Sequence, residues 1–588
     1  MARTPPRSGA RPATSCWRSR GSHADAMRDA PNLNLAWTSL AAEECRRLGV
    51  RHAVVSPGSR SAPLAVAFAR QPGIEVHVAH DERGGAFMAL GIAQATEVPA
   101  LAIMTSGTAV ANALPAAVEA RMARVPLLVF AADRPPELRD CGANQSIPQA
   151  GLLDGAVRWS ADLPCPTTEV PAEYVLSTVD EAFARACGLS GGHAGAVHLN
   201  WQFREPLAPE ERAWDRAWLG SIARWTRGGA PWRTTLSVEP EPLAVDDGIV
   251  VAGLGADRWL PGSWRGTVLA DAASGRADAG RVGADLVLRT AADCVPLAEA
   301  LAPPCITMVG GGIASRRIGE WVARQPCPVV TVGAGDPRQD PSHRAALAVS
   351  GGVTLVAGRG LRAHPAWTRA MRIATAAAAR ALAADTRLTE PTAIATTMAA
   401  VAGARCGTVF LGSSMPVRDA DFMAVAPPKG WTTAANRGAS GIDGLISTAT
   451  GHAAASGAPV LAVVGDVSAL HDLNALQLAS TLDVPLVILV LNNDGGGIFR
   501  YLPIARHADV FERLFATPHG RTFAPVARAF GLAAESPRTR AALGTAVRRA
   551  LRRRGATLIE VTCTREASER ARAEAVAAAD AALRRSFR

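Results

Sequence analysis

Lysine is almost absent from this sequence. Lys429 is the only one, so arginine supplies nearly all the positive charge behind the formal net charge of +10. The arginines are scattered among acids, which disfavours a nucleic-acid-binding surface. No apolar run approaches the roughly 18 residues that span a bilayer, so no membrane association is expected. The 10 cysteines include no C-x-x-C pair and no zinc spacing, which favours free thiols in a reducing cytoplasm.

The chain is too long for one domain. At roughly 100–200 residues per domain, 588 residues predict about three domains. The first 30 residues, rich in Arg, Ser and Pro, are predicted to be a disordered extension. Short apolar runs then alternate with helical spacing, which is typical of parallel sheets with helices on both faces. We therefore predict three sequential α/β domains at 31–205, 206–388 and 389–588. A stretch rich in Trp, Arg and Pro at 205–240 is typical of a linker, and the charged helix at 565–588 is predicted to be solvated.

Two buried strands of the third predicted domain end in oxygen-bearing side chains. One ends in Gly465-Asp466, and the next is followed by Asn493 and the glycines 495–497. Ligands of open α/β sheets bind at the carboxyl ends of the strands. An Asp carboxylate, an Asn amide oxygen and a Gly495 carbonyl suit a Mg²⁺ ion that also holds a diphosphate, and Ser468 is placed to donate to a phosphate oxygen. Either fragment alone would be an ordinary turn; the two together predict a metal and diphosphate site.

This arrangement resembles the thiamine diphosphate enzyme superfamily, whose diphosphate motif is G-D-G followed farther along by N-N. Val467 stands here in place of the second glycine. The resemblance implies thiamine diphosphate with Mg²⁺, or Mn²⁺, as cofactors. It also implies a catalytic glutamate in the first domain that hydrogen-bonds N1′ of the aminopyrimidine, and Glu82 in HDERGG matches that position. By position alone, Glu82 would equally be an acid stabilised at a helix N-terminus.

Five further segments resemble one family of that superfamily, the 2-succinyl-5-enolpyruvyl-6-hydroxy-3-cyclohexene-1-carboxylate synthases of menaquinone biosynthesis. They are SPGSRSAPL (56–64), TSGTAVAN (105–112), ADRPPELRDCGANQSI (132–147), NRGASGIDG (436–444) and GDVSALHDLNAL (465–476). In that family a residue other than glycine after Gly-Asp is ordinary. The resemblance implies a transferase that decarboxylates 2-oxoglutarate and adds the product to isochorismate. It also implies a homodimer or homotetramer, because in the superfamily the glutamate-bearing domain of one subunit meets the diphosphate domain of another.

Substrates that carry several carboxylates favour an arginine-lined pocket, because guanidinium binds carboxylate through two parallel hydrogen bonds. The candidate substrate-binding residues inside the family-like segments are Ser59, Arg60, Arg134, Gln145, Arg418 and Arg437. Ile498 and Phe499 are predicted to form an apolar wall near the reacting carbon. The predicted cofactor site comprises Glu82, Ser413, Ser414, Gly465, Asp466, Ser468, Asn493, Gly495, Gly496 and Ile498, with Asp466, Asn493 and Gly495 as metal ligands.

Two other interpretations stay open. One is another thiamine diphosphate enzyme, such as an acetohydroxyacid synthase or a 2-oxo acid decarboxylase, although the arginines favour dicarboxylate substrates. The other is an inactive relative that only binds ligands, which the presence of Glu82, Asp466 and Asn493 disfavours. None of the 12 histidines stands in a metal-binding pair, and none can be assigned to proton transfer. Arg316 and Arg317 are weaker candidates for binding the acceptor.

Overall fold

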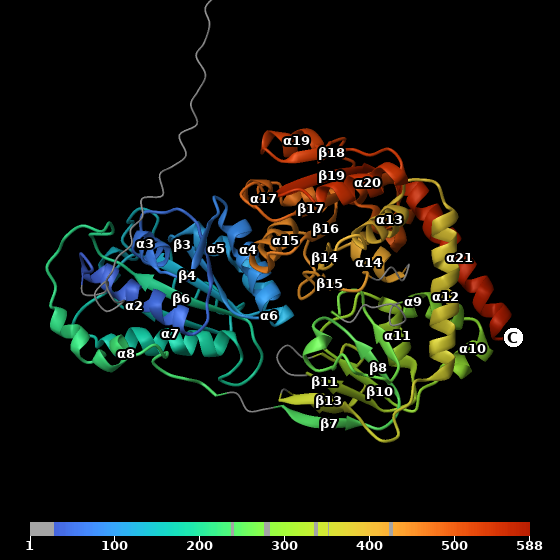
Figure 1. Cartoon of the computed structure of the whole chain (residues 1–588), viewed down its shortest axis with the longest axis horizontal. Coiled ribbons are helices and arrows are strands. Elements are labelled where there is room, and N and C mark those ends of the chain that lie inside the picture. The colour runs from blue at the N-terminus through green and yellow to red at the C-terminus, as the bar shows by residue number, and fades with distance from the viewer. Residues whose placement is uncertain (1–28, 237–239, 276–282, 334–338, 351, 423–426) are drawn as a thin grey trace, which may run out of the picture.

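The computed structural model describes residues 29–236, 240–275, 283–333, 339–350, 352–422 and 427–588. Residues 1–28 of the predicted extension lie outside this part of the chain. Three α/β domains follow one another, and every strand pair among the described residues is parallel. In Figure 1 the first domain runs from blue to teal, the middle domain is green to yellow, and the third is orange to red. The predicted fold class is confirmed.

The first domain is built on a six-stranded sheet of order β2-β1-β3-β4-β6-β5. The central strands β3 and β4 are buried on both faces and are apolar apart from Asp133 at the end of β4, so helices must cover both sides. The strands are β1 (His52–Val55), β2 (Glu75–Val78), β3 (Ala100–Met104), β4 (Leu127–Asp133), β5 (Trp159–Leu163) and β6 (Ala196–Gln202). The helices are α2 (Leu33–Arg47), α3 (Ala62–Arg70), α4 (Glu82–Thr96), α5 (Thr108–Asn112), α6 (Leu114–Ala123), α7 (Ala172–Ala186) and α8 (Ala223–Arg227).

The stretch predicted as a linker is partly packed. Trp218 and Trp225 are buried in the core on one face of the first sheet, and the Trp225 indole N–H donates to Glu44 at 2.5 Å. The tryptophans therefore hold residues 207–225 against the first domain, and that part of the linker prediction is wrong. A Trp- and Pro-rich composition indicates irregular backbone, but the large apolar rings still seek burial.

The middle domain contains a five-stranded sheet, β12-β11-β10-β8-β9, and a separate pair, β13-β7. Its strands are β7 (Glu241–Val245), β8 (Ile249–Ala252), β9 (Val268–Ala270), β10 (Ile306–Val309), β11 (Val329–Val332), β12 (Ala345–Val349) and β13 (Val353–Ala357). Its helices are α9 (Ala284–Ala291), α10 (Val295–Ala300), α11 (Arg316–Arg324) and α12 (Pro365–Ala384). The long helix α12 runs beside α21 of the third domain (Figure 1), so the two domains share a core.

The third domain repeats the strand order of the first. Its sheet reads β15-β14-β16-β17-β19-β18, which is the same arrangement when the strands are numbered within the domain. The strands are β14 (Gly407–Leu411), β15 (Trp431–Ala434), β16 (Val460–Gly465), β17 (Leu486–Asn492), β18 (Ala533–Glu535) and β19 (Ala556–Thr562). The helices are α13 (Glu390–Val401), α14 (Met415–Phe422), α15 (Leu445–Ser456), α16 (Asp466–His471), α17 (Ala475–Ala479), α18 (Ala508–Phe511), α19 (Ala524–Ala529), α20 (Arg540–Ala550) and α21 (Arg565–Ser586).

The first and third domains meet along α4 and α15, the helices that follow the second strand of each sheet (Figure 1). Glycine lets the two backbones approach closely. A Cβ atom at Gly91 would lie 2.0 Å from the carbonyl oxygen of Thr448, and one at Gly451 would lie 2.1 Å from that of Met88. Any larger residue would force the helices apart.

Helix α21 is not the solvated tail predicted from its charge. Every fourth residue along it is small or apolar and buried: Ala571, Ala575, Ala579 and Leu583. The last three belong to the core that α21 shares with α12 and α9. Four-residue spacing keeps them on one face of the helix. Because charged residues flank this narrow stripe, the composition of the segment does not reveal it. Among the described residues, no helix combines the length and apolarity that crossing a membrane requires.

Candidate functional site

A cavity of about 320 Å³ opens at the carboxyl edge of the third sheet. Eleven predicted site residues line it: Ser414, Arg418, Arg437, Gly465, Asp466, Ser468, Asn493, Gly495, Gly496, Ile498 and Phe499. The remaining lining residues were not predicted: Glu390, Met415, Pro416, Ser440, Ile442, Val467, Gly497, Phe515 and Thr517. Ser413 is not in this lining; it is buried beside the cavity, where its hydroxyl donates to the Asn436 carbonyl at 3.3 Å.

Asp466 and Asn493 lie together where the neighbouring strands β16 and β17 end. The Oδ2 atom of Asp466 accepts the backbone N–H groups of Asn493 at 3.1 Å and Gly495 at 2.9 Å. Its Oδ1 atom accepts from Val467 at 2.7 Å. Burial raises the pKa of Asp466, although these donors act in the opposite direction. The structure thus brings the two strand ends to one place.

Asn493 presents an oxygen that has no partner. Its Nδ2 donates to Glu390 Oε1 at 2.8 Å, whereas its Oδ1 is buried without a hydrogen bond to any described residue. Leaving a buried acceptor unsatisfied costs about 1–3 kcal/mol. The nearby Gly495 carbonyl accepts from Gly497 at 2.9 Å and keeps its second lone pair. Carboxylate, amide and carbonyl oxygens are the ligands that Mg²⁺ prefers, and Mn²⁺ accepts the same set, so these residues fit the predicted metal.

The glycine turn after Asn493 is required by a close neighbour. Gly495 has φ +127°, and a Cβ atom there would lie 1.9 Å from the carbonyl oxygen of Ala516. The N–H of Gly496 donates to the same carbonyl at 2.7 Å. The turn therefore packs directly on the segment 512–516, which closes one side of the cavity with Phe515.

Arg418 and Arg437 line the cavity together. Arg418 donates to the Ser414 carbonyl at 2.8 Å, and the buried Nε of Arg437 has no hydrogen-bond partner among the described residues. Burial and the positive charge of Arg437 lower the pKa of Arg418. An anion between the two guanidinium groups would relieve their repulsion, and a carboxylate matches the guanidinium fork.

The first domain fixes the loop that carries Arg437. Glu119 of α6 accepts the backbone N–H groups of Gly438 at 2.8 Å and Ala439 at 2.7 Å. Burial raises the pKa of Glu119 to about 7, because the two donors do not fully offset the loss of water. Glu119 of the first domain thereby positions the loop of the third domain that carries Arg437.

Glu82 is the first residue of α4, after the N-cap Asp81. Asp81 accepts from the backbone of Arg83 at 3.0 Å, which fixes the helix start. The carboxylate of Glu82 is half-buried and accepts from Asn112 Nδ2 at 3.4 Å. Glu82 is not among the residues that line the cavity of the third domain.

A second arginine pair lies in the first domain. Arg134 follows β4 and contacts the Ser106 hydroxyl, while Gln145 donates to the Ser106 carbonyl at 2.8 Å. Arg60 donates to the Phe203 carbonyl at 2.8 Å, and its buried Nε has no hydrogen-bond partner among the residues described. Burial, with the charge of Arg60, lowers the pKa of Arg134. Ser59, next to Arg60, is exposed.

The predicted residues therefore form two half-sites in one chain. One is the third-domain cavity, whose lining residues all come from 390–517. The other comprises Glu82, Arg60 and Arg134, which follow β2, β1 and β4 of the first domain, and Gln145, which bonds to Ser106 as Arg134 does. Arg316 belongs to neither: it begins α11, is 86% exposed at its side chain, and pairs with Glu320.

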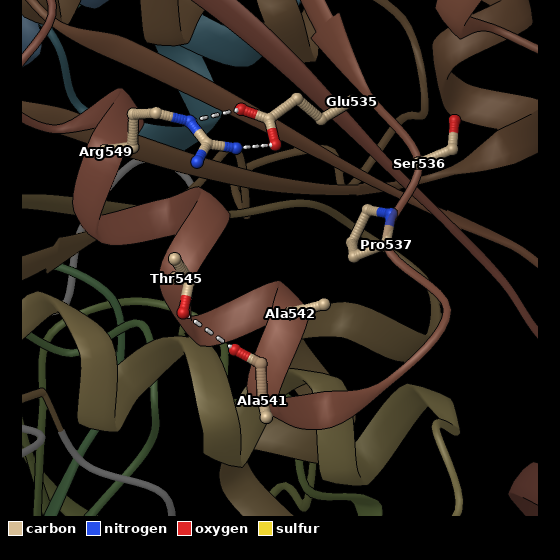
Figure 2. Close-up of a pocket in the computed structure, with 7 residues that line it drawn as sticks. All are labelled: Glu535, Ser536, Pro537, Ala541, Ala542, Thr545 and Arg549. Carbon is tan, nitrogen blue, oxygen red and sulfur yellow. Dashed lines mark hydrogen bonds and ion pairs between the residues drawn. The ribbon is translucent and has the colours of Figure 1, made fainter.

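A separate hollow between β18 and α20 has no comparable chemistry (Figure 2). The only charged residues in its lining, Glu535 and Arg549, are bonded to each other, and Thr545 donates to the Ala541 carbonyl within the helix. None of the seven lining residues has a buried polar side-chain atom without a partner. We therefore assign no ligand to it.

The residues that orient the Asn493 side chain were not predicted from the sequence. Glu390 uses its second oxygen to accept from Arg572 at 2.5 Å, and Arg572 binds Asp419 through two bonds of 2.6 Å. His519 lies 3.2 Å from Asp466 Oδ2 and was also not assigned. The sequence signal for Glu390 is only an acid at the start of a helix, which usually indicates a dipole interaction.

Two family models match the chain at the two half-sites. The "Thiamine pyrophosphate enzyme, N-terminal TPP binding domain" matches residues 37–152, and the "Thiamine pyrophosphate enzyme, C-terminal TPP binding domain" matches 414–561. Fold and site together therefore define a thiamine pyrophosphate enzyme.

Curated proteins named 2-succinyl-5-enolpyruvyl-6-hydroxy-3-cyclohexene-1-carboxylate synthase align with nearly the whole chain. The protein from Salinibacter ruber is 39% identical, covering 91% of this chain and 95% of its own. The protein from Rubrobacter xylanophilus is 40% identical, and the alignment covers 92% of this chain and 97% of its own. The protein from Chlorobium phaeovibrioides is 35% identical, and the alignment covers 92% of this chain and 96% of its own. The chain belongs to the family of 2-succinyl-5-enolpyruvyl-6-hydroxy-3-cyclohexene-1-carboxylate synthases.

Proposed function

We propose that this enzyme decarboxylates 2-oxoglutarate and adds the resulting four-carbon unit to isochorismate. The products are 2-succinyl-5-enolpyruvyl-6-hydroxy-3-cyclohexene-1-carboxylate and CO2, a step of menaquinone biosynthesis. The observation that carries the proposal is the pair of arginines in each half-site, Arg418 with Arg437 and Arg60 with Arg134. 2-Oxoglutarate keeps one carboxylate after decarboxylation and isochorismate brings two. Decarboxylation of pyruvate would leave no carboxylate for these guanidinium groups to bind.

The residues of the third domain would hold the cofactor. Asp466, Asn493 and Gly495 would bind Mg²⁺ or Mn²⁺, while Ser414, Ser468, Gly465 and Gly496 border the space for the diphosphate. Thiamine diphosphate, when bound, supplies the electron sink for decarboxylation. Glu82 would accept the hydrogen bond of the protonated pyrimidine nitrogen.

Ile498 and Phe499 would exclude water from the reacting carbon. Both are half-buried in the turn that follows the glycines, and Phe499 packs edge-on against Phe515 with ring centroids 5.7 Å apart. An apolar wall there favours attack on isochorismate over protonation by solvent. Arg418 and Arg437, which line the same cavity, would orient the acceptor.

We also propose that two chains complete each active site, in a homodimer or a homotetramer. Two observations support this: Glu82 lines no part of its own chain's cavity, and apolar side chains beside the lining residues Phe499 and Phe515 are exposed. The exposed fractions are 48% for Tyr501, 44% for Leu502 and 56% for Leu514. An exposed apolar rim of this kind favours a protein partner, and the first domain of a second copy would bring Glu82 to the cavity.

Co-expression of two inactive variants tests the shared site. Glu82→Gln and Asp466→Asn each disable every active site when expressed alone. Mixed dimers carry one intact site out of two, so a random mixture should regain roughly a quarter of wild-type turnover. Sites formed within single chains would leave the mixture inactive.

Mass detection of the adduct tests the reaction itself. We expect the adduct and CO2 from 2-oxoglutarate plus isochorismate only when thiamine diphosphate and Mg²⁺ are present. Turnover of pyruvate without a preference for 2-oxoglutarate would favour another carboligase. Cofactor binding without turnover of either acid would indicate an inactive relative.

We propose that the enzyme is cytoplasmic. The nine cysteines that the structure describes are all free thiols, which is the usual state in a reducing compartment. Localisation of a tagged chain by cell fractionation tests this placement.

A further inference from the structure

Three potential metal ligands meet on one face of the first sheet, away from the half-sites. His52 lies opposite Glu75 in the parallel pairing of β1 with β2, and His77 lies two residues farther along β2. Residues two apart on a strand share a face. His52 Nδ1 is 3.2 Å from His77 Nε2, and the Glu75 carboxylate lies 3.8 Å from His52 and 3.9 Å from His77.

Both imidazoles are largely buried. The side chains of His52 and His77 are 14% and 13% exposed, and burial lowers the pKa of each, although Glu75 acts in the opposite direction. A lowered pKa favours the neutral imidazole, which offers a lone pair to a metal ion. Without a metal, the two rings share at most one N–H···N hydrogen bond.

We propose that His52, His77 and Glu75 bind a divalent transition-metal ion, with Zn²⁺ the best match. At Zn–N bonds of about 2.0–2.1 Å, a nitrogen separation of 3.2 Å corresponds to an N–Zn–N angle of about 100°. The Glu75 side chain is 64% exposed, so it can move the roughly half ångström that a tetrahedral edge of about 3.3 Å requires. Two imidazoles and one carboxylate are a known zinc set and leave the fourth position to water. Imidazole nitrogen disfavours Mg²⁺.

The site is separate from the cofactor half-sites. His52 and Glu75 are the first residues of β1 and β2, so they lie at the amino edge of the sheet, opposite the edge where Glu82 lies. β2 is the edge strand of this sheet. A bound ion would tie it to β1 and thereby raise the unfolding temperature of the first domain.

Metal titration of the untagged enzyme, saturated with Mg²⁺ and thiamine diphosphate, tests the proposal. We expect one equivalent of Zn²⁺ per chain by calorimetry, and a tetrahedral Co²⁺ absorption band when Co²⁺ replaces it. His52→Gln and His77→Gln should each weaken Zn²⁺ binding roughly 100-fold or more, because even groups outside the ligand shell change affinity 10–100-fold. His80→Gln, at an exposed histidine of the same segment, is the matched control and should bind as wild type.

Two results would overturn the proposal. One is a wild-type enzyme that takes up no Zn²⁺ once Mg²⁺ fills the cofactor site, which would leave only a hydrogen bond between the rings. The other is unchanged Zn²⁺ affinity in both ligand variants. Circular dichroism of the metal-free variants checks that they fold. Turnover of 2-oxoglutarate with isochorismate should be the same in all of them, so failure here leaves the proposed function untouched.

Discussion

Glu390 decides which atom of Asn493 faces the cavity. A carboxylate only accepts hydrogen bonds, so the amide nitrogen must turn toward Glu390 and the amide oxygen must turn away. Arg572 neutralises this buried acid and ties it to the C-terminal helix. The orientation of a proposed metal ligand thus depends on residues far away in the sequence.

Glu390→Gln is predicted to weaken Mg²⁺ binding. Glutamine can donate to the oxygen of Asn493 as well as accept from its nitrogen, so the amide is free to turn its nitrogen toward the metal. We expect a roughly 10–100-fold lower affinity, the usual effect of losing a group that orients a ligand. Calorimetric Mg²⁺ titration in the presence of thiamine diphosphate measures it. Glu299→Gln, at an exposed glutamate on α10, is the control; equal affinities in both variants would contradict the assignment.

Arg437→Lys and Arg60→Lys are predicted to impair substrate binding. Lysine keeps the charge but lacks the planar fork, so each variant should lose about 1.5–3 kcal/mol, the value of a hydrogen bond to a charged group. The loss should appear in kcat/KM for the substrates, with thiamine diphosphate affinity unchanged. Arg316→Lys, at an arginine that pairs on the surface, should behave as wild type. A fall in cofactor affinity alone would place these arginines elsewhere in the mechanism.

At the scale of elements, the contact between α4 and α15 depends on glycine. Gly451→Ala is predicted to destabilise the protein by about 1–3 kcal/mol or more, the usual cost of overpacking, because its Cβ would meet the Met88 carbonyl. Gly319→Ala on α11 is the matched control, since its Cβ would meet no atom within 4 Å. Helix propensity predicts that the control gains up to about 1 kcal/mol. Urea denaturation of the two variants measures both effects, and equal shifts would refute the close packing.

The sequence predicts those elements whose apolar pattern is continuous. The buried strands at β16 and β17 could be foreseen, and so could the meeting of Asp466 with Asn493, because parallel strands end at one edge. The edge strand β2 alternates polar and apolar residues and shows no buried run. The buried stripe of α21 is masked by its charges. Partners such as Glu390 with Arg572, or His52 with His77, come together only through tertiary packing, which spacing along the chain does not encode.

At the scale of the whole molecule, the junction of the first and third domains contains a titrating group. The pKa of Glu119 is about 7 in the folded chain, against an ordinary value of 4.5. Between these values the folded state binds more protons than the unfolded state, so rising pH lowers stability in this window. The protonated Glu119 carboxyl group therefore contributes stability at low pH, and this stability is lost as the pH rises through about 7.

The wild type is therefore predicted to lose up to about 3 kcal/mol relative to Glu119→Gln between pH 5 and pH 8. Glutamine does not titrate, so the difference between the two proteins isolates this group. Denaturation midpoints at both pH values measure it. A difference that stays constant with pH would show that Glu119 is ionised throughout, with its two backbone donors outweighing burial.

The shared strand order of the first and third domains has a consequence for descent. Two six-stranded sheets with one connectivity, joined in a single chain and packed through equivalent helices, indicate duplication of an ancestral gene. In the proposed site, the first domain would hold the ring end of the cofactor and the third domain its charged tail.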